Sequence, residues 1–320
     1  MSNSAKLVDD TPAAQPAPDA VRPLDPRPAW PGEASQARGR SVRLAGGRSR
    51  SRRLGQSARA WPVSVALACL VVAVIITWAA FPELLAPHSA WDPSGASLEP
   101  PSAKHLFGTD LIGRDQLARV IFGARESLLG AALAVTLGLV AGITLGTIAG
   151  AAGGVADQIV MRAVDVLLAV PALLAALVVV VLLGRGTTNA ALAVGIGSVA
   201  GFARLVRAEV VKVRHSEYVE AAYSSGGSFA TVLIRHILPN SLRPVLALLP
   251  LQLGGAILAL ATLGFLGYGV QPPDPEWGMM IADGRNLLGS APWITAFPGL
   301  LLAATVLATH RLSRSLGGRS

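Results

Sequence analysis

Long runs without a charged side chain recur along this 320-residue chain and constrain its fold more than any other feature. The first run, residues 62–82, matches the stretch of about 20 apolar residues that crosses a bilayer as a helix. Backbone groups in lipid must satisfy their hydrogen bonds internally, so such runs are predicted to be α-helices. Only 14% of the residues are charged and 52% are hydrophobic, which excludes an ordinary soluble domain. The sequence therefore predicts an all-α, polytopic membrane protein.

Six apolar runs, two of them with an arginine near one end, are predicted to cross the membrane, at residues 62–82, 127–150, 166–184, 189–206, 243–267 and 292–309. Glycines recur in the second run at intervals of four or eight residues, which predicts a small-residue stripe where another helix packs closely. Pro171 interrupts the third run and predicts a kink. A short loop is expected before the third run, because it is preceded by the polar residues Asp157, Arg162 and Asp165.

Basic residues flank these runs unevenly. The stretch 38–59 contains no acidic residue and precedes the first run, and four basic residues end or follow the fourth run: Arg204, Arg207, Lys212 and Arg214. Cytoplasmic loops carry an excess of Lys and Arg, so this bias predicts that both termini and the segment after the fourth run are cytoplasmic. Three arginines fall outside in this topology and are expected to snorkel at an interface: Arg114, Arg119 and Arg125.

Residues 1–60 are rich in proline, alanine, serine and arginine and lack apolar periodicity. Such a composition cannot bury enough surface to offset its ordering entropy, so a disordered tail is predicted. The net charge of +8 would suit nucleic acid, but the arginines flank apolar runs, which favours contact with anionic lipid. A signal peptide is disfavoured because the first apolar run begins too late.

A polar segment, residues 83–126, separates the first two runs and is expected outside the membrane. The strings GTD and GRD end in Asp110 and Asp115 and predict a turn that caps an amphipathic interfacial helix. The two aspartates would also suit a metal or catalytic site, but no constellation of histidine or cysteine is evident with them, so neither is expected. Cys69 is the single cysteine, which excludes a disulfide within the chain.

The longest polar interruption in the C-terminal half is segment 216–240, which predicts two short helices around a glycine hinge. Ser216 is a preferred N-cap residue, and Glu217 and Glu220 lie in the first turn, where the helix dipole favours negative charge. The glycine pair 226–227 is predicted to end this helix, because glycine readily takes the left-handed conformation.

Ser228 is predicted to cap a second short helix, Phe229–His236, with Arg235 in its last turn. Pro239 should prevent much continuation, because proline lacks an N–H and clashes with the preceding turn. The result is a compact helix pair suited to fit into a cleft on a partner protein.

The spacing of segment 216–240 resembles the EAA loop of ABC-importer permease subunits. It reads EAA from Glu220, then a glycine at Gly226, then HILP ending at Pro239. His236 replaces the isoleucine of the pattern, as expected for the peptide-importing branch. The string YSS before the glycine departs from the pattern but leaves the spacing intact.

Two further stretches are similar to the peptide and nickel importer permeases. FGTD, GRD and GARESL lie within residues 107–128, and FLGYGVQPPDPEWG covers residues 265–278. The resemblance spans about residues 60–310. It implies six transmembrane helices in the permease fold of type I ABC importers, and a C-type permease subunit of a dipeptide or oligopeptide importer that forms half the translocation path.

The resemblance also implies the partners: a homologous B-type permease subunit, two ATP-binding subunits and an extracytoplasmic substrate-binding protein, in the bacterial plasma (inner) membrane. This chain would be no enzyme and would bind no cofactor, metal or nucleic acid, with ATP and Mg²⁺ held by partner subunits. The residues expected to couple to the ATPase are Glu217, Glu220, Ala221, Ala222, Gly226, Arg235 and Pro239.

Two absences agree with a permease that is energised elsewhere. The sequence lacks the GxxxxGK[ST] phosphate loop, and the central parts of the six runs lack ionisable side chains, which ion-coupled carriers usually need. The alternatives are the same subunit importing nickel, glutathione or another small solute, a stand-alone carrier or channel, and a membrane anchor that displays the basic tail.

The expected division has four parts. Residues 1–60 form a basic cytoplasmic tail, and residues 61–126 form the first transmembrane helix with an extracytoplasmic segment. Residues 127–310 form the core permease domain, which contains the cytoplasmic coupling loop at 216–240. Residues 311–320 form a short basic cytoplasmic tail.

Overall fold

The computed structural model describes residues 63–317, so the tail predicted at residues 1–60 lies outside the described part. Within that part every named element is helical, and the only extended pairings are two isolated bridges. This confirms the predicted all-α class. In chain order the helices are α1 (Val63–Ala80), α2 (Pro82–Leu85), α3 (Gln116–Ala152), α4 (Gly154–Ala169), α5 (Ala172–Leu183), α6 (Thr187–Arg214), α7 (Glu217–Ser224), α8 (Phe229–Val232), the π-helical turn η1 (Leu233–Ile237), α9 (Leu238–Ala247), α10 (Leu249–Phe265), α11 (Trp277–Gly284) and α12 (Trp293–Gly317).

Four helices are long and apolar enough to cross a membrane alone: α1, α3, α6 and α12. Two bent pairs are long and apolar enough when each is taken as one span: α4 with α5, bent by 90°, and the helical stretch Phe229–Ala247 with α10, bent by 51°. Counted in this way, the described residues contain the six predicted spans. Pro171 lies at the first bend, and Val170 before it is extended, as the residue before a proline usually is. The kink predicted at Pro171 is therefore confirmed.

Helix α3 is longer than the sequence indicated, because the expected interfacial helix and the second span are one element of 37 residues. Asp115 caps it, its side chain accepting a hydrogen bond from the N–H of Ala118. No proline interrupts residues 116–152, and the glycines that would weaken a helix in water here face a neighbouring helix. The turn and cap were predicted correctly, and the break after the interfacial helix was wrong.

The glycine stripe of α3 packs against α6, as its spacing predicted. A Cβ added at Gly146 would lie 2.7 Å from the Cβ of Val206, and one at Gly150 would lie 2.9 Å from the Cβ of Val210. Real Cβ atoms do not approach each other this closely. The backbones of α3 and α6 can therefore come into contact only because Gly146 and Gly150 have no side chain.

Helix α4 occupies the residues expected to form a short loop. Asp157 and Asp165 lie on it and pair with Arg207 and Arg204 of α6. Nε and Nη2 of Arg207 donate to the two carboxylate oxygens of Asp157, at 2.9 and 2.6 Å. The loop prediction was wrong because Asp157 and Asp165, about two turns apart on this helix, are each paired with an arginine of another helix.

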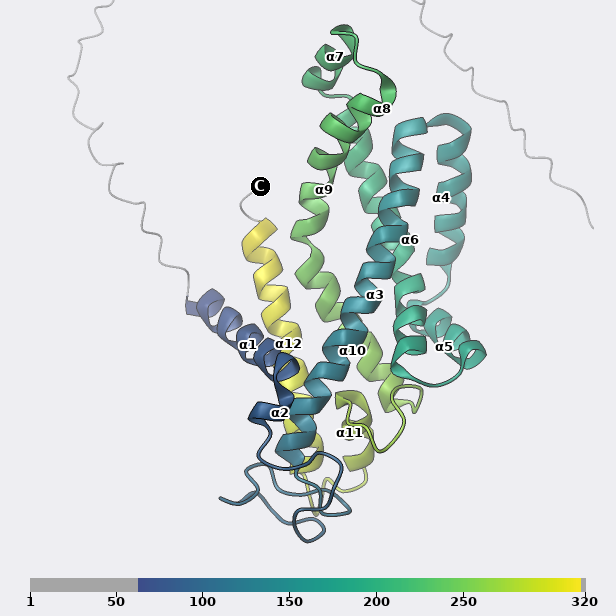
Figure 1. Ribbon diagram of the computed structural model, residues 1–320. Helices are drawn as coiled ribbons and strands as arrows, with labels where there is room; N and C mark the ends of the chain where they lie inside the picture. The colour runs from purple at the N-terminus through teal and green to yellow at the C-terminus, as the bar shows by residue number, and fades with distance from the viewer. Residues whose placement is uncertain (1–62, 318–320) are drawn as a thin grey trace, which may run out of the picture. The chain divides into compact units, whose positions relative to one another are not determined.

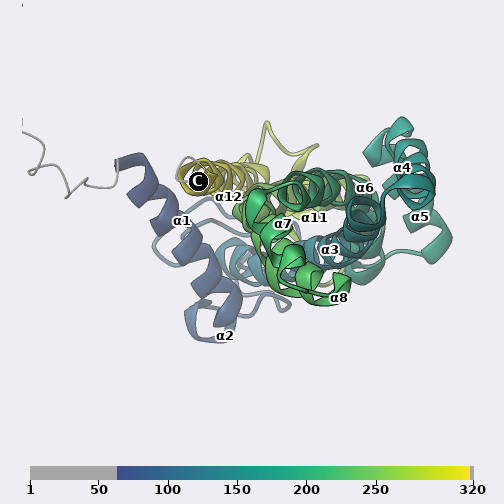
Figure 2. The same cartoon turned by 90° about the horizontal axis from the view of Figure 1, so that it is seen from above.

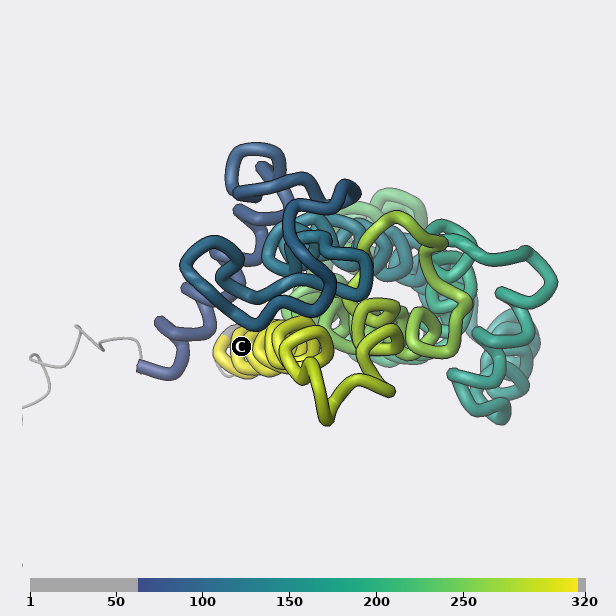
Figure 3. The backbone as a smooth tube through the Cα atoms, turned by 90° about the horizontal axis from the view of Figure 1, so that it is seen from below, coloured from purple at the N-terminus to yellow at the C-terminus, as the bar shows by residue number. Residues whose placement is uncertain are grey.

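Segment 216–240 and segment 86–115 lie at opposite ends of the helices (Figure 1). Seen from above, α7 and α8 fall between α12 on one side and α4 and α5 on the other (Figure 2). From below, segment 86–115 lies near the loops around α11 (Figure 3). Trp293 at the start of α12 reaches segment 86–115, donating its indole N–H to the carbonyl oxygen of Thr109 at 3.1 Å.

The far end of α12 lies beside the beginning of α1, because Arg311 donates to the hydroxyl oxygen of Ser64 at 2.8 Å. Both ends of the described chain are therefore on one side of the bundle. Helix α12 continues to Gly317 through Arg311 and Arg314, so much of the stretch expected as a separate short tail at 311–320 is helical.

Candidate functional site

Helix α7 ends in a closed glycine turn. The N–H of Gly227 donates to the carbonyl oxygen of Ala222 at 3.1 Å, and the N–H of Gly226 donates to that of Tyr223 at 2.9 Å. These two bonds form a Schellman motif, which requires the left-handed conformation that Gly226 adopts, with φ +86°. The predicted glycine ending of the first short helix is confirmed.

The two glycines serve different physical needs. A Cβ on Gly226 would meet no atom within 4 Å, so the backbone angle alone demands glycine there. A Cβ on Gly227 would lie 2.7 Å from the Ala222 oxygen and 2.8 Å from a methyl group of Val232, so space demands glycine there. The seven predicted site residues left out Gly227, although the glycine pair itself was the available signal.

The caps of the two short helices turned out differently. Ser216 occupies the N-cap position of α7, but its hydroxyl donates back to the carbonyl oxygen of Val213, so the predicted side-chain cap is absent. Ser228 does cap α8, its hydroxyl accepting the N–H of Thr231 at 3.4 Å. The first helix is closed at its C-terminus by the glycine turn and the second at its N-terminus by serine.

Pro239 does not end the helical path, which corrects the prediction for the second helix. α8 passes through η1 directly into α9, and Pro239 lies in the first turn of α9. A π-turn changes the hydrogen-bond partners of the backbone, and a proline is tolerated where a helix begins. Arg235 lies within the π-turn. Segment 216–240 is therefore joined by continuous helix to the bent pair α9–α10.

Segment 216–240 is anchored by aliphatic side chains and exposes aromatic and acidic ones. Val219, Val232 and Ile237 are at most 1% exposed. On the outside, 45% of Tyr218 and 54% of Phe229 are accessible, beside an exposed Ile234 and Tyr223. Aromatic residues are enriched in protein–protein interfaces, so their exposure on this segment favours a contact surface.

The seven predicted site residues are all within this exposed region, with only Ala222 half-buried. Glu217, Glu220 and Ala221 are exposed on α7, Gly226 is in the glycine turn, and Arg235 and Pro239 are exposed further along. Among the residues that the structure describes, Glu217, Glu220 and Arg235 form no ion pair. Their charges are available to a partner.

A second feature is a cavity of about 390 Å³ between α3, α5, α6 and α10. Its walls are mostly aliphatic or small, and its polar side chains are Ser198, Gln252 and Thr262. Gly197 and Gly255 also line it, and a Cβ on either would meet no atom within 4 Å. The lining has no ionisable side chain, which agrees with the chemically neutral path expected from the apolar runs.

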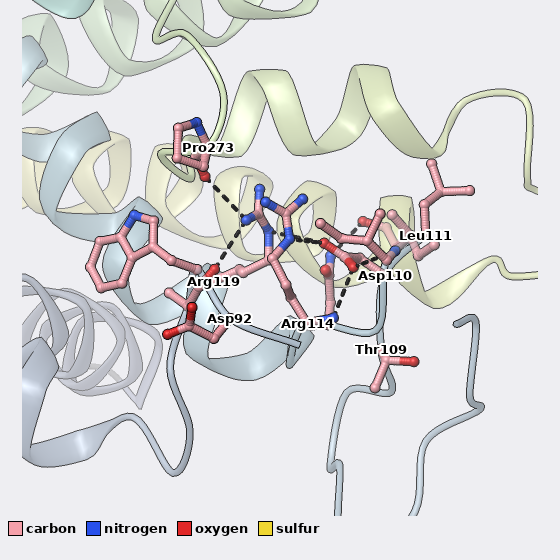
Figure 4. A network of polar contacts seen from close by, with 12 residues as sticks. Asp92, Thr109, Asp110, Leu111, Arg114, Arg119 and Pro273 are labelled. Atoms are coloured by element: carbon pink, nitrogen blue, oxygen red, sulfur yellow. Dashed lines mark hydrogen bonds and ion pairs between the residues drawn. The ribbon is translucent and has the colours of Figure 1, made fainter. Parts of the chain in front are cut away.

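At the opposite end, an ion network fastens segment 86–115 to distant parts of the chain (Figure 4). Nε of Arg114 donates to Asp110 at 2.6 Å, and Nε of Arg119 lies 3.6 Å from the same carboxylate. Arg119 also donates to the carbonyl oxygens of Ala90, at 3.1 Å, and Pro273, at 3.3 Å. Arg119 is only 4% exposed, so the expectation that it snorkels is wrong. The buried guanidinium is stabilised because Nη1 donates to two carbonyl oxygens and the charge lies beside Asp110.

The stretch FLGYGVQPPDPEWG begins α11 through a buried carboxylate. Glu276 accepts the N–H groups of Gly278, at 2.8 Å, and Met279, at 2.9 Å, and the hydroxyl of Ser127 donates to it at 3.3 Å. Burial raises the pKa of Glu276 above its usual range, and the hydrogen bonds from Gly278 and Met279 oppose this rise. The indole of Trp277 donates to the carbonyl oxygen of Val120 at 3.0 Å, which fixes α11 against α3.

Asp115 has histidine neighbours, contrary to the expectation for the two aspartates. Nδ1 of His105 lies 2.8 Å from Oδ2 of Asp115, and Nδ1 of His88 lies 3.2 Å from the same oxygen. These histidines are 10 and 27 positions before Asp115 in the sequence. Sequence inspection missed them because irregular backbone brings them together, with no helical or strand period between them.

Comparisons with known proteins agree with this architecture. Residues 142–319 match the family model described as "Binding-protein-dependent transport system inner membrane component". The chain is 41% identical over 248 residues to the dipeptide transport system permease protein DppC of Alkalihalophilus pseudofirmus, covering 77% of this chain and 82% of the relative. It is also 41% identical over 252 residues to the glutathione transport system permease protein GsiD of Shigella flexneri serotype 5b, covering 78% and 83%.

Among solved structures, the chain is similar to a crystal structure of an amino acid ABC transporter with histidines, with a TM-score of 0.50 and 17% identity. The likeness covers 64% of this chain and 95% of the other. At this identity it shows the fold alone, and it supports the six-helix importer permease fold. By its family match and its relatives, the chain belongs to the inner membrane components of binding-protein-dependent transport systems, as a multi-pass permease subunit that is not itself catalytic.

Proposed function

We propose that this chain is the C-type permease subunit of an ATP-driven importer of dipeptides or oligopeptides. It forms half the translocation path, together with a homologous B-type permease subunit. The similarity to the dipeptide permease DppC supports this substrate class. The neutral cavity between α3, α5, α6 and α10 supports a path in which the solute meets small, apolar and uncharged polar groups.

One observation carries the coupling mechanism: a closed helix pair exposes Tyr218, Phe229 and unpaired carboxylates, and continues as helix into a bent span. In this proposal Glu217, Glu220, Ala221, Ala222, Gly226, Arg235 and Pro239 shape the surface that docks on an ATP-binding subunit. The glycine turn resists deformation, and the path through η1 carries a displacement of α7 and α8 to α9. Such a transfer requires rigid bodies, because a flexible loop would absorb the motion.

The proposal places segment 216–240 in the cytoplasm, where two ATP-binding subunits bind ATP with Mg²⁺ and hydrolyse the ATP. The basic residues of α6 support a cytoplasmic position for this segment. The contact between Arg311 and Ser64 supports it too, because it groups both described ends of the chain together on that side. Segment 86–115 then faces outward, where a substrate-binding protein delivers the solute. Both termini are cytoplasmic in this topology.

The test is reconstitution of the complete complex in liposomes. Gly226→Val and Glu220→Lys should each lower ATP hydrolysis stimulated by the loaded binding protein by about tenfold, because the first strains the left-handed turn and the second reverses a docking charge. Ser225→Val is the control for the first variant, since Ser225 has a negative φ. Glu83→Lys, which makes the same charge change at the exposed opposite end, is the control for the second.

Membrane insertion and assembly should stay normal in all four variants. If Gly226→Val and Glu220→Lys retain full stimulation, the proposed coupling surface is wrong. As a direct probe, Ala221→Cys in a Cys69→Ser background should cross-link to an ATP-binding subunit that carries a cysteine in its docking cleft. The chain alone in liposomes should transport nothing, whereas a stand-alone carrier would.

A second candidate solute is glutathione, favoured by the similarity to the glutathione permease GsiD. Nickel or another small solute would use the same architecture. An uptake assay with the complex and its own binding protein separates these cases. If excess glutathione does not reduce the uptake of a labelled dipeptide, the result supports the peptide importer. Efficient competition by glutathione supports the second candidate.

A further inference from the structure

Three side chains at the end opposite segment 216–240 direct ligand atoms to one place. They are His88, His105 and Asp115, and the three atoms all lie within 4.8 Å of one another. The two measured contacts to Oδ2 of Asp115 are 2.8 Å from Nδ1 of His105 and 3.2 Å from Nδ1 of His88. Ligand atoms around a tetrahedral cation with bonds of about 2.0–2.1 Å are separated by about 3.4 Å. Small side-chain adjustments would convert this cluster into such a site.

Hydrogen bonding leaves two imidazole nitrogens of this cluster unsatisfied. Nδ1 of His88 makes no hydrogen bond despite its distance of 3.2 Å from Asp115, and Nε2 of His105 has no hydrogen-bond partner. His105 and Asp115 are fully buried. Buried polar atoms without partners are uncommon in folded proteins and usually have a reason. A cation between the three residues gives the Nδ1 lone pair of His88 a partner.

The charges around the cluster also favour a cation. Asp115 and Glu99 are acidic, and within residues 63–315 their ion pairs involve only the two histidines. Oε2 of Glu99 lies 4.0 Å from Nε2 of His105. Histidines that bind a metal commonly donate their other ring N–H to a carboxylate, and an approach of about 1 Å would bring Glu99 into that role. A divalent ion would balance the two carboxylates.

Gly95 keeps this second carboxylate close. A Cβ on Gly95 would lie 2.8 Å from Nε2 of His105 and 3.0 Å from Oε2 of Glu99. Any larger residue would push the Glu99 carboxylate and the imidazole apart. The two carboxylate oxygens of Asp115 have separate roles. Oδ1 accepts the N–H of Ala118 at 2.8 Å and caps α3, while Oδ2 faces the histidines.

We propose that His88, His105 and Asp115 bind a divalent transition-metal ion of the Zn²⁺ class, with Glu99 orienting His105. Two imidazoles and one carboxylate are ligands that suit Zn²⁺, and three protein ligands leave a fourth position for water or another donor. The His88 side chain is 29% exposed, so the cluster is reached from that side. The ion fastens the chain after α2 and the loop at residue 105 to the N-terminus of α3. This site is independent of the solute proposed above.

The test uses the purified full-length chain in detergent, freed of metal with a chelator. Titration with Zn²⁺ should show one ion bound per chain, and Co²⁺ in its place should give the visible absorption of a low-coordinate site with nitrogen ligands. His88→Ala and Asp115→Asn should each weaken Zn²⁺ binding by at least about tenfold and change the Co²⁺ spectrum. Asp115→Asn keeps an oxygen to cap α3.

His215→Ala is the matched control, because His215 is exposed and its Nδ1 bonds to its own helix at the carbonyl oxygen of Val211. It should bind Zn²⁺ like the wild type. At a Zn²⁺ concentration above the wild-type Kd and below that of His88→Ala, Zn²⁺ should raise the Tm of the wild type and of His215→Ala and leave that of His88→Ala nearly unchanged. Should Asp115→Asn fail to fold, the partly exposed His88 still decides the question. Absence of stoichiometric Zn²⁺ binding, or full binding by His88→Ala, would overturn the proposal, and the three side chains would then serve only to hold the fold of this end together.

Discussion

The N–H of Gly227 donates to the carbonyl oxygen of Ala222 at 3.1 Å, and a Cβ on Gly227 would lie 2.7 Å from that same oxygen. The hydrogen bond that closes the end of α7 and the contact that excludes a side chain at residue 227 therefore involve the same oxygen atom. Together they fix the turn that joins α7 to α8.

Gly227→Ala should loosen this turn. The added methyl group forces the Ala222 oxygen away and weakens the closing bond by about 1–3 kcal/mol, so the amide of residue 227 should exchange its hydrogen about 10–100 times faster. Hydrogen exchange read by mass spectrometry measures this. Ser225→Ala should leave the exchange of that amide near the wild-type rate, and equal rates for all three proteins would refute the close contact.

Arg119→Met should destabilise the protein strongly, because it leaves Asp110 partly buried with one cation fewer and frees two carbonyl oxygens. Removing one partner of a buried ion pair costs about 3–5 kcal/mol. The comparison is Arg125→Met, which removes an exposed pair with Glu83 that should contribute about 0–1 kcal/mol. Thermal unfolding in detergent reports the difference, and similar shifts in Tm for both variants would contradict the assigned role of the buried network.

Ala259→Phe should obstruct the cavity between α3, α5, α6 and α10. The ring takes up part of the 390 Å³ volume, so solute uptake by the reconstituted complex should fall about tenfold or more. ATP hydrolysis stimulated by the binding protein should stay within about twofold of the wild-type rate, since the proposed coupling route runs through α8, η1 and α9. Leu300→Phe, at an exposed position of α12, should leave both activities unchanged. Normal uptake by Ala259→Phe would remove the cavity from the path.

Glu276 should make the stability depend on pH with a defined sign. Burial raises its pKa in the folded state above the unfolded value of 4.5. As pH falls through the raised pKa, the folded state takes up a proton that the unfolded state does not yet bind, so the free energy of unfolding rises until about pH 4.5.

The measurement for Glu276 is the Tm of the wild type minus that of Glu276→Gln, followed from about pH 8 to about pH 5. This difference should become more positive toward acid, because the glutamine does not titrate. A difference that stays constant or falls would show that the carboxylate remains ionised when folded, held by Gly278, Met279 and Ser127.

Local features of the candidate site followed well from the sequence. The glycine end of α7, the serine cap of α8 and the kink at Pro171 each depend on one residue acting on its neighbours. The prediction that Pro239 ends the second short helix was wrong. The effect of the proline depends on whether the preceding turn is α- or π-helical, and here the π-helical turn η1 lets the helix continue into α9.

Features that depend on distant partners could not be predicted. Asp157 on α4 pairs with Arg207, 50 positions later, so its polar stretch was taken for a loop. Arg119 can be buried because the carbonyl oxygen of Pro273, 154 positions away, accepts a hydrogen bond from it, and without that acceptor snorkelling would be the better expectation. Gly227 was left out of the site because its role is steric and involves Val232 of the next helix.

The sequence by itself determined that this chain is a bundle of membrane-spanning helices with a polar helix pair between the fourth and fifth spans. Each apolar run must satisfy its own backbone hydrogen bonds in lipid, and that requirement acts on every run separately. Only the tertiary structure decided where charge is paired and where it stays exposed, and which histidines meet Asp115. Those outcomes depend on side chains brought together from distant positions, and the free energy of burying a polar group is set by the partner that it finds.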